Sequence, residues 1–218
     1  MKIQRQTVSE ILWQSLSKLM KLDAFANFRL VGGTSLSLML GHRKSVDIDL
    51  FTDVEYGGID FDEILEVLKV EFEYVDFLNW NNTTIGNSCF IGNSPDASIK
   101  LDLYYTDPFV YPIINYQDIR LSRLEEVAAM KLDVIGRGGR KKDFWDIHAL
   151  FDHYDLSQML DFYSLRYPYN HSKDELILGL INFESADTDP DPICLEGKYW
   201  ELIKLDFEDK IMNYRSQF

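Results

Sequence analysis

The sequence predicts an α+β fold, in which a mixed β-sheet with helices is followed by an all-helical C-terminal half. Two short segments of the first half, 47–51 and 98–104, alternate apolar and polar residues as half-buried strands do. From Ser122 onward the apolar residues instead recur at helical spacing. We therefore expect two domains, an α/β core at 1–116 and a helical domain at 117–218.

Composition and charge narrow the class of protein. The 218 residues are 46% hydrophobic and 14% aromatic, which is enough for a packed core and excludes a disordered chain. The net charge of −14 argues against broad, non-specific binding to nucleic acid, which requires many Lys and Arg side chains. The sequence has neither a signal peptide nor an apolar run of about 18 residues, so we expect no membrane span. Cys89 and Cys194 lie far apart and fit reduced thiols in a cytoplasmic protein.

Apolar spacing and turn residues divide the first half into alternating helices and strands. Ser9 or Thr7 caps the first helix, Asp60 caps a later one, and Asn81-Asn82 suits a hairpin turn. In order, we expect a helix at 7–22, a strand at 28–31, a glycine turn at 32–33, a helix at 34–40, a basic turn at 42–45, a strand at 47–51, a helix at 61–70, strands at 70–80, 83–91 and 98–104, and a linker at 107–116.

The second half reads as a series of helices. Ser122 and Glu125 have the spacing of a capping box, and a glycine-rich segment, 136–139, ends the helix that they begin. Asp143 suits the cap of the next helix. We expect further helices at 144–153, 155–166, 172–181 and 199–214, with an acidic loop at 184–192.

Paired carboxylates are the strongest functional signal. Alternation along the strand at 47–51 places Asp47 and Asp49 on one face, and Asp102 occupies a similar position in the strand at 98–104. Two carboxylates on one face repel each other unless a cation lies between them. Mg²⁺ is suited to such a site, because it binds one or two carboxylates and completes its shell with water and substrate phosphates. An isolated Asp-x-Asp is usually a solvated surface pair, so the interpretation depends on the neighbouring motifs.

The glycine pair Gly32-Gly33 precedes these carboxylates. Glycine lacks a Cβ, so the backbone can approach a phosphate closely and adopt positive φ. A helix that opens at Thr34 or Ser35 would add free N–H groups and the positive end of its dipole. This combination suits a triphosphate, although a glycine pair alone would be interpreted as a structural turn.

Basic residues and late aspartates supply further candidates, each with a structural alternative. Lys131 lies among apolar neighbours and either extends to solvent or reaches a phosphate in a cleft between the two halves. Asp143 is explained as a helix cap, whereas Asp146 has no such explanation and would face the same cleft. The histidines lack metal-ligand spacing, so a zinc site is not expected. Seven basic residues form either a local basic patch or a solvated helix face and loop: Arg120, Arg123, Lys131, Arg137, Arg140, Lys141 and Lys142.

These motifs together resemble the nucleotidyltransferase superfamily typified by polymerase beta, and more narrowly the AbiEii/AbiGii toxin family of type IV toxin–antitoxin systems. The resemblance covers most of 28–151 and rests on Gly32-Gly33-Thr34, His42-Arg43-x-Ser45-x-Asp47-Ile48-Asp49-Leu50-Phe51, Lys100-Leu101-Asp102, Met130-Lys131-Leu132 with Arg137, and Lys142-Asp143-Phe144-x-Asp146. It implies a nucleotidyltransferase-type sheet that brings Asp47, Asp49 and Asp102 onto adjacent strands.

The resemblance also implies roles for these residues. Asp47 and Asp49 would hold Mg²⁺ or Mn²⁺, with Asp102 as a third carboxylate that binds metal or accepts a proton. Lys131 would contact the nucleotide, and either Asp143 or Asp146 would be the late acidic residue of the family. The nucleoside triphosphate would be held by a larger set, Gly32, Gly33, Thr34, Ser35, Arg43 and Ser45.

The implied reaction is metal-dependent transfer of a nucleoside monophosphate from a nucleoside triphosphate to an acceptor. Two metal ions would clamp the reacting phosphate. RNA, such as the end of a tRNA, is the favoured acceptor and a protein side chain the alternative, with a cognate antitoxin as a partner. Two other interpretations stay open at this point: a non-catalytic binding protein of the same fold, and a metal-dependent nucleotide phosphohydrolase.

Overall fold

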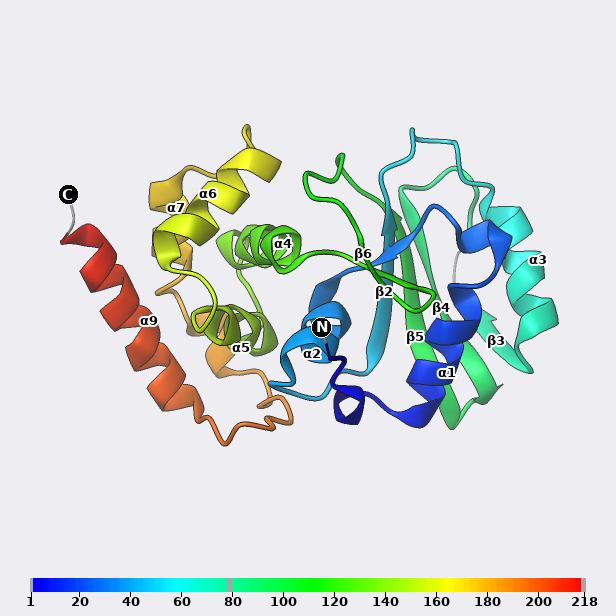
Figure 1. Cartoon of the computed structure of the whole chain (residues 1–218), viewed down its shortest axis with the longest axis horizontal. Helices are drawn as coiled ribbons and strands as arrows, with labels where there is room; N and C mark the ends of the chain where they lie inside the picture. The colour runs from blue at the N-terminus through cyan, green and yellow to red at the C-terminus, as the bar shows by residue number, and fades with distance from the viewer. Residues whose placement is uncertain (1, 78–79, 217–218) are drawn as a thin grey trace.

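A mixed β-sheet organises the N-terminal half of the computed structural model, which describes residues 2–77 and 80–216 (Figure 1). Within these residues the sheet has seven strands in the order β3-β4-β5-β2-β1-β7-β6. Their bounds are β1 Arg29–Leu30, β2 Asp47–Thr52, β3 Tyr74–Phe77, β4 Gly86–Ser94, β5 Ala97–Tyr105, β6 Ile114–Tyr116 and β7 Ile119–Leu121. The α+β class expected from the sequence is confirmed.

Strand β2 lies at the centre of the sheet and fixes the positions of the acidic residues. It pairs antiparallel with β1 and parallel with β5. The register places Asp47 opposite Lys100 and Asp49 opposite Asp102. Because side chains directly opposite each other project from the same face, all four lie on one face of the sheet. The expected adjacency of the carboxylate strands is therefore confirmed.

The other face of the sheet is the apolar one. Ile48 and Leu50 of β2 and Leu101 and Leu103 of β5 are fully buried there. Helices α1 (Glu10–Leu19) and α3 (Phe61–Glu71) pack on this face (Figure 1). Their predicted caps are confirmed: Ser9 accepts a hydrogen bond from Leu12 N, and Asp60 accepts from Asp62 N and Glu63 N. Helix α1 is shorter at both ends than the helix expected at 7–22, and short 3₁₀ turns, η1 (Arg5–Thr7) and η2 (Asp23–Phe25), lie before and after it.

Three boundaries in the first half differ from the prediction. Helix α2 (Gly32–Leu40) begins at the glycine pair itself, two residues earlier than expected. Helix α3 extends through Glu71, so β3 begins only at Tyr74, and the expected continuation through 78 and 79 lies outside the described residues. Strand β4 continues to Ser94, and only Pro95 and Asp96 separate it from β5.

The segment predicted as a linker ends in β6, the first strand of a hairpin that belongs to the sheet. Strands β6 and β7 pair antiparallel around Gln117, whose φ is 52°, and Leu121 pairs parallel with Leu30 of β1. The prediction failed because three-residue strands are too short to show alternation. The expected division at 116/117 falls within this hairpin, and we propose that the α/β core ends after Leu121 instead.

The second half is helical and has its own core. Its elements are α4 Leu124–Gly136, α5 Lys141–Leu150, α6 Leu156–Arg166, α7 Lys173–Gly179, α8 Glu184–Asp187 and α9 Trp200–Arg215. Phe144, Trp200 and Phe207 are buried at its centre together with Leu36 of α2. Leu38 of the same helix lies in the first core. Helix α2 therefore joins the two halves.

Two predicted caps and one predicted loop in this half are wrong. Arg123, not Ser122, is the N-cap of α4 and makes no side-chain cap bond. Asp143 lies in the first turn of α5, where its Oδ2 accepts the backbone N–H of Arg140 at 3.0 Å. The expected loop at 184–192 begins with the short helix α8.

No helix among the described residues is long and apolar enough to cross a membrane.

Candidate active site

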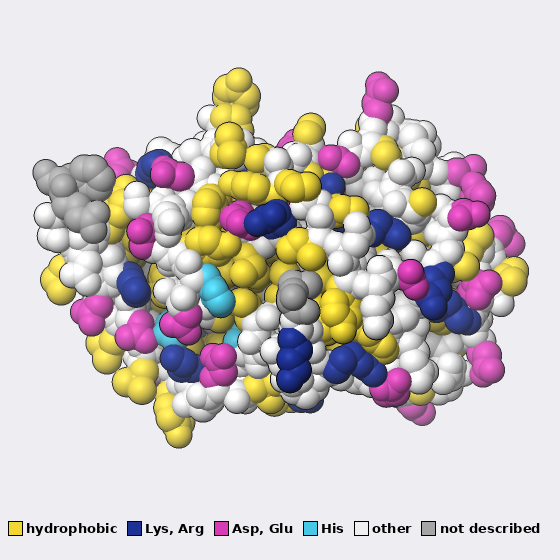
Figure 2. All heavy atoms as spheres, in the orientation of Figure 1, with side chains coloured by type: hydrophobic (Ala, Val, Ile, Leu, Met, Phe, Trp, Pro, Cys, Tyr) yellow, Lys and Arg dark blue, Asp and Glu magenta, His cyan; other side chains and the backbone are white. Residues whose placement is uncertain are grey.

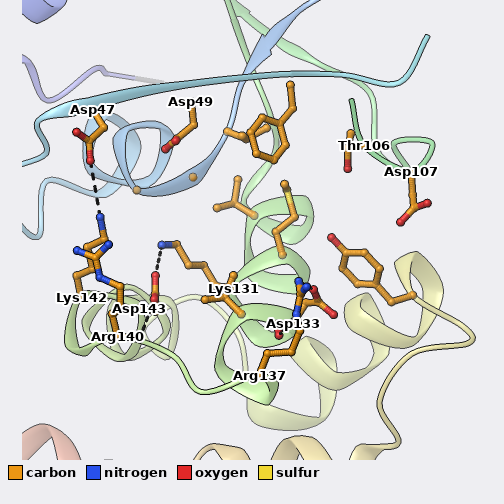
Figure 3. Close-up of a pocket in the computed structure, with 18 of the residues that line it drawn as sticks. Asp47, Asp49, Thr106, Asp107, Lys131, Asp133, Arg137, Arg140, Lys142 and Asp143 are labelled. Carbon is orange, nitrogen blue, oxygen red and sulfur yellow. Dashed lines mark hydrogen bonds and ion pairs between the residues drawn. The ribbon is translucent and has the colours of Figure 1, made fainter. Parts of the chain in front are cut away.

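A cleft of about 760 Å³ separates the polar face of β2 from helices α4 and α5 (Figure 3). Asp47 and Asp49 line it from the sheet, and Lys131, Lys142 and Asp143 line it from the helices. The two predicted metal carboxylates therefore face the two predicted late motifs across one cavity, although the motifs are separated by more than eighty residues of sequence.

Asp49 is the most perturbed acid of the cleft. Burial, the Asp102 carboxylate and the Asp47 carboxylate together raise the pKa of Asp49 to about 6, against the smaller opposing effect of Lys131. Lys142 is the nearest cation to Asp47, with 3.8 Å between Lys142 Nζ and Asp47 Oδ2. The carboxylates are thus close together and incompletely neutralised, which is the arrangement that a divalent cation stabilises.

The glycine pair makes room for side chains of the site. Gly32 has φ +66°, and a Cβ there would lie 2.5 Å from Asp49 Oδ2. A Cβ on Gly33 would collide with the guanidinium of Arg43. Both glycines line the cleft at the start of α2. Glycine is required here because Asp49 and Arg43 pack against the backbone, a reason that the sequence did not show.

Thr34 and Ser35, predicted to hold the triphosphate, are fully buried and do not line the cleft. The Thr34 hydroxyl donates to the Asp47 carbonyl oxygen and lies 2.8 Å from Ser45 Oγ. Their side chains are turned away from the cleft because α2 begins two residues earlier than expected. Their part in holding the triphosphate stays a prediction. Ser45 does line the cleft.

A buried ion network lies behind the cleft wall. Asp146 is completely buried and accepts hydrogen bonds from His42 Nε2 at 2.8 Å and from Arg43 Nε at 2.6 Å. Lys131 Nζ lies 2.7 Å from Asp146 Oδ2 and donates to Asp143 Oδ1 at 2.6 Å. Burial alone would raise the pKa of Asp146, but Arg43 and Lys131 hold it well below its usual range.

This network shows where Asp143, Asp146 and Lys131 lie, which the sequence left open. Asp143 lines the cleft, whereas Asp146 lies behind it and holds Arg43 and Lys131 in place, so the expectation that Asp146 faces the cleft is wrong. Lys131 neither extends to solvent nor projects freely into the cavity. Burial lowers the pKa of Lys131, but the Asp146 and Asp143 carboxylates outweigh it and raise the pKa.

Asp102 has other partners. Its Oδ1 accepts a hydrogen bond from the Ser88 hydroxyl, and its Oδ2 accepts one from Lys100 Nζ at 2.6 Å. It does not line the cleft, and no group of three or more His, Cys, Asp or Glu among the described residues is placed to hold a metal ion. The geometry therefore does not support Asp102 as a third metal ligand. Asp47 and Asp49 alone still fit one Mg²⁺, which commonly uses two carboxylates.

The seven basic residues do not form one patch. Arg120 donates to the carbonyl oxygens of Phe28, Met20 and Phe25, so it is structural. Arg123, Arg137 and Lys141 pair with Glu125, Asp133 and Asp191 respectively. On the face shown in Figure 2, Lys and Arg side chains are interspersed with Asp and Glu side chains.

Arg140 and Lys142 also belong to this set of seven, and both line the cleft next to Asp47 (Figure 3). Burial and the neighbouring Arg140 and Lys131 cations lower the pKa of Lys142. Sequence reasoning gave Lys142 no role of its own. Its position in the sequence directly before Asp143 could have identified Lys142 as a cleft residue.

The opposite end of the cleft is mixed in character. Thr106 and Asp107 lie at this end (Figure 3), and Phe51 and Met130 add apolar surface to the lining. The cavity thus has a cationic end beside Asp47 and an apolar end with polar groups at its margin. A nucleoside triphosphate has the same polarity, with charge at one end and a flat base at the other.

A mixed sheet with paired carboxylates on its central strand, a glycine-led helix beside them and cations across the cleft defines a nucleotidyltransferase. The chain belongs to the AbiEii family, described as the nucleotidyl transferase AbiEii toxin of type IV toxin–antitoxin systems, which matches residues 14–213. The resemblance found in the sequence is therefore confirmed.

The chain is also similar to individual proteins. An uncharacterised protein of Aquifex aeolicus (strain VF5) is 26% identical over 215 residues, covering 92% of this chain and 94% of that protein. An H. pylori protein described as a candidate nucleotidyltransferase has a TM-score of 0.60 at 19% identity and covers 96% of both chains. MenT4, a nucleotidyltransferase toxin of Mycobacterium tuberculosis H37Rv, has a TM-score of 0.54 at 14% identity and covers 90% of this chain and 84% of that chain. At these identities the two structural likenesses show the fold alone. 

Proposed function

We propose that this nucleotidyltransferase transfers a nucleoside monophosphate from a metal-bound nucleoside triphosphate to the hydroxyl end of an RNA, with a tRNA end favoured. The observation that carries the proposal is the placement of Asp47 and Asp49 on one wall of the cleft, with Lys142 and Arg140 across from Asp47. This pairing of carboxylates and cations suits a metal ion and the phosphates that accompany it.

The polarity of the cleft orients the nucleotide. Its phosphates would lie at the end formed by Arg140, Lys142 and the start of α2 at Gly32-Gly33, where free N–H groups and the helix dipole favour negative charge. The sugar and base would then extend along β2, between Phe51 and Met130. A nucleotide in the reverse orientation would place its phosphates beside the Asp107 carboxylate.

Asp47 and Asp49 are the residues that would hold Mg²⁺ or Mn²⁺. The raised pKa of Asp49 and the absence of a side chain at Gly32 beside its Oδ2 both fit a cation bound there. Such an ion supplies Lewis-acid polarisation of the phosphate and neutralises the charge of the leaving group.

The protein's own groups position the reactants. Lys142 and Arg140 would stabilise the negative charge that develops on the departing pyrophosphate. Asp146 acts through its partners, since it fixes Arg43 beside Gly33 and Lys131 beside Asp143. The acceptor hydroxyl oxygen forms a bond to the α-phosphorus while the bond from that phosphorus to the pyrophosphate oxygen breaks. The hydroxyl proton passes to solvent, so the products are the extended acceptor and pyrophosphate.

The toxin family adds a regulatory context to the proposal. A cognate antitoxin is the expected partner of a type IV toxin. Of the two other interpretations left open by the sequence, membership of an enzyme family sets aside the non-catalytic binding protein. Nucleotide hydrolysis is distinguished from transfer by its products.

Incubation with each α-labelled nucleoside triphosphate, Mg²⁺ and total RNA tests the proposal. Label in RNA together with free pyrophosphate is the expected result. Label in protein would show that the acceptor is a protein side chain and not RNA. Free labelled monophosphate would identify a phosphohydrolase. No label transfer with any of the four nucleotides would contradict the proposal. The Asp60→Asn protein is a matched control, because Asn caps a helix as well as Asp does and Asp60 lies outside the cleft.

A further inference from the structure

The polar face of the sheet continues beyond the cleft. From β2 outward, the next strands are β5, β4 and β3, and the helices α1 and α3 pack on the opposite, apolar face. Lys100, Asp102 and Phe90 lie on the polar face but do not line the cleft. Phe90, in the middle of β4, is 46% exposed.

The strand register connects this surface directly to the site. Asp47 lies opposite Lys100, and Lys100 lies opposite Phe90, so the three form one row across β2, β5 and β4. Two strand spacings correspond to about 10 Å between Asp47 and Phe90 along the row. Phe90 is therefore near enough to contact a molecule whose end reaches the carboxylates.

Two aromatic rings lie in another row on the same face, and the row of Asp49, Asp102 and Ser88 separates it from the first. Phe51 and Tyr104 are opposite each other, with ring centroids 5.8 Å apart. The Tyr104 ring lies over Gly86 of β4, where a Cβ would collide with it. We call the surface of β4 and β5 that carries Phe90, Lys100 and Tyr104 the aromatic platform.

The chemistry of transfer favours this side for the acceptor. In phosphoryl transfer the attacking and leaving oxygens lie roughly in line, on opposite sides of the phosphorus. Arg140 and Lys142, the cations suited to the departing pyrophosphate, lie on the helical side of Asp47. The attacking hydroxyl must then approach from the other side, where β5 and β4 present the aromatic platform.

Lys100 supplies positive charge on this surface, while Asp76 of β3 lies opposite Phe90 on the same face. Lys100 Nζ donates to Asp102 and keeps further N–H donors for a phosphate, since an ammonium has three. The pair also neutralises Asp102, which would otherwise repel a phosphate. Exposed aromatic rings bind single-stranded nucleic acids by stacking on the bases.

We infer that the aromatic platform holds the single-stranded 3′ end of the acceptor RNA, with a base stacked on Phe90 and a backbone phosphate near Lys100. This inference rests on the proposed function, because it gives the acceptor hydroxyl its route to the α-phosphorus. In the transfer step that hydroxyl oxygen bonds to the α-phosphorus, pyrophosphate leaves toward Arg140 and Lys142, and the hydroxyl proton leaves to the solvent that reaches this open surface.

Binding of RNA by fluorescence anisotropy tests the inference without requiring transfer. The probes are a fluorescent hairpin RNA with a single-stranded 3′ overhang and the same hairpin with a blunt end. Phe90→Ala removes the ring on which a base would stack, so it should weaken binding of the overhang RNA roughly 5- to 100-fold. Phe90→Trp should retain it, because the larger ring can still stack. Tyr199→Ala, which removes a 70% exposed aromatic residue next to α9, is the matched control.

The outcomes separate this inference from the proposed function. The inference is supported if Phe90→Ala, but not the other variants, loses binding of the overhang RNA. Its binding of the blunt-ended hairpin and its nucleotide-induced shift in melting temperature should be unchanged. Equal affinity of wild type and Phe90→Ala for the overhang RNA would overturn it even if wild type transfers label to RNA. If the Phe90 variants behave as expected but no label is transferred, the proposed reaction fails while the RNA surface stands.

Discussion

Asp49 carries an electrostatic cost in the absence of a cation. Burial and the neighbouring Asp102 and Asp47 carboxylates raise its pKa to about 6, so the folded state favours the protonated form. As the pH rises from about 4 to about 6, the folded protein therefore loses stability relative to the unfolded chain, whose Asp ionises near pH 3.9. A pKa difference of this size corresponds to up to about 3 kcal/mol at neutral pH.

Asp49→Asn removes that cost. In metal-free buffer at pH 7.5 we expect the variant to be more stable than wild type by up to about 3 kcal/mol, with the difference vanishing below about pH 4. Urea unfolding across this pH range measures it. The same variant should lose transfer activity, because one of the two metal carboxylates has lost its charge. A variant that is inactive because it does not fold, or that retains normal transfer, would contradict the role of Asp49.

The two lysines of the cleft differ in burial, so their replacement should have different effects. Lys131→Met removes the ammonium that pairs with Asp143 and Asp146 in a buried network. We expect it to lower the free energy of unfolding by roughly 3–5 kcal/mol. The side chain of Lys142 is 34% exposed, and Lys142→Met should change stability by less than about 1 kcal/mol while weakening nucleotide binding. Urea unfolding and nucleotide titration give the two quantities. Comparable stability losses in the two variants would contradict the separation of roles.

At the scale of the element, the start of α2 depends on the absence of a side chain. Gly32 and Gly57 both have positive φ, but only at Gly32 would a Cβ meet other atoms, namely those of Asp49. Gly57→Ala should therefore incur only the backbone cost, about 1–2 kcal/mol. Gly32→Ala should cost more and should also abolish the metal- and nucleotide-induced rise in melting temperature, because it displaces Asp49. Equal effects of the two substitutions in both measurements would be inconsistent with this packing.

The elements that position the site differ in how well the sequence predicts them. Alternation along β2 and β5 places Asp47, Asp49 and Asp102 on one face, because side-chain direction in a strand follows directly from residue order. The contact between His42 and Asp146 spans 104 residues, and no local pattern indicates it. The sequence therefore predicts the carboxylate strands but not the partners of Asp102 and Asp146, which depend on how distant elements pack.

At the scale of the whole molecule, the cleft lies where the two halves are joined. Helix α2 contributes to both cores, and the segment before α9 pairs with the basic turn through Lys44 N to Ile193 O at 2.8 Å and Leu195 N to His42 O at 2.9 Å. The buried pairing of Arg43 with Asp146 is a third connection. A ligand that contacts both β2 and α5 therefore stabilises the interface between the halves as well as each wall of the cleft.

Binding should consequently be visible in the stability of the entire chain. A ligand at about 100 times its Kd adds about 2.7 kcal/mol to the free energy of unfolding, which raises the melting temperature by roughly 5–10 °C for a protein of this size. We expect this shift with Mg²⁺ and the preferred nucleoside triphosphate together. Nucleotide with a chelator should give much less, because Asp47 and Asp49 repel the phosphates when no cation lies between them. Differential scanning fluorimetry measures all combinations, and the Asp49→Asn protein should show no metal-dependent shift. An equal shift with nucleotide in chelator would show that the carboxylates do not hold a metal ion for the nucleotide.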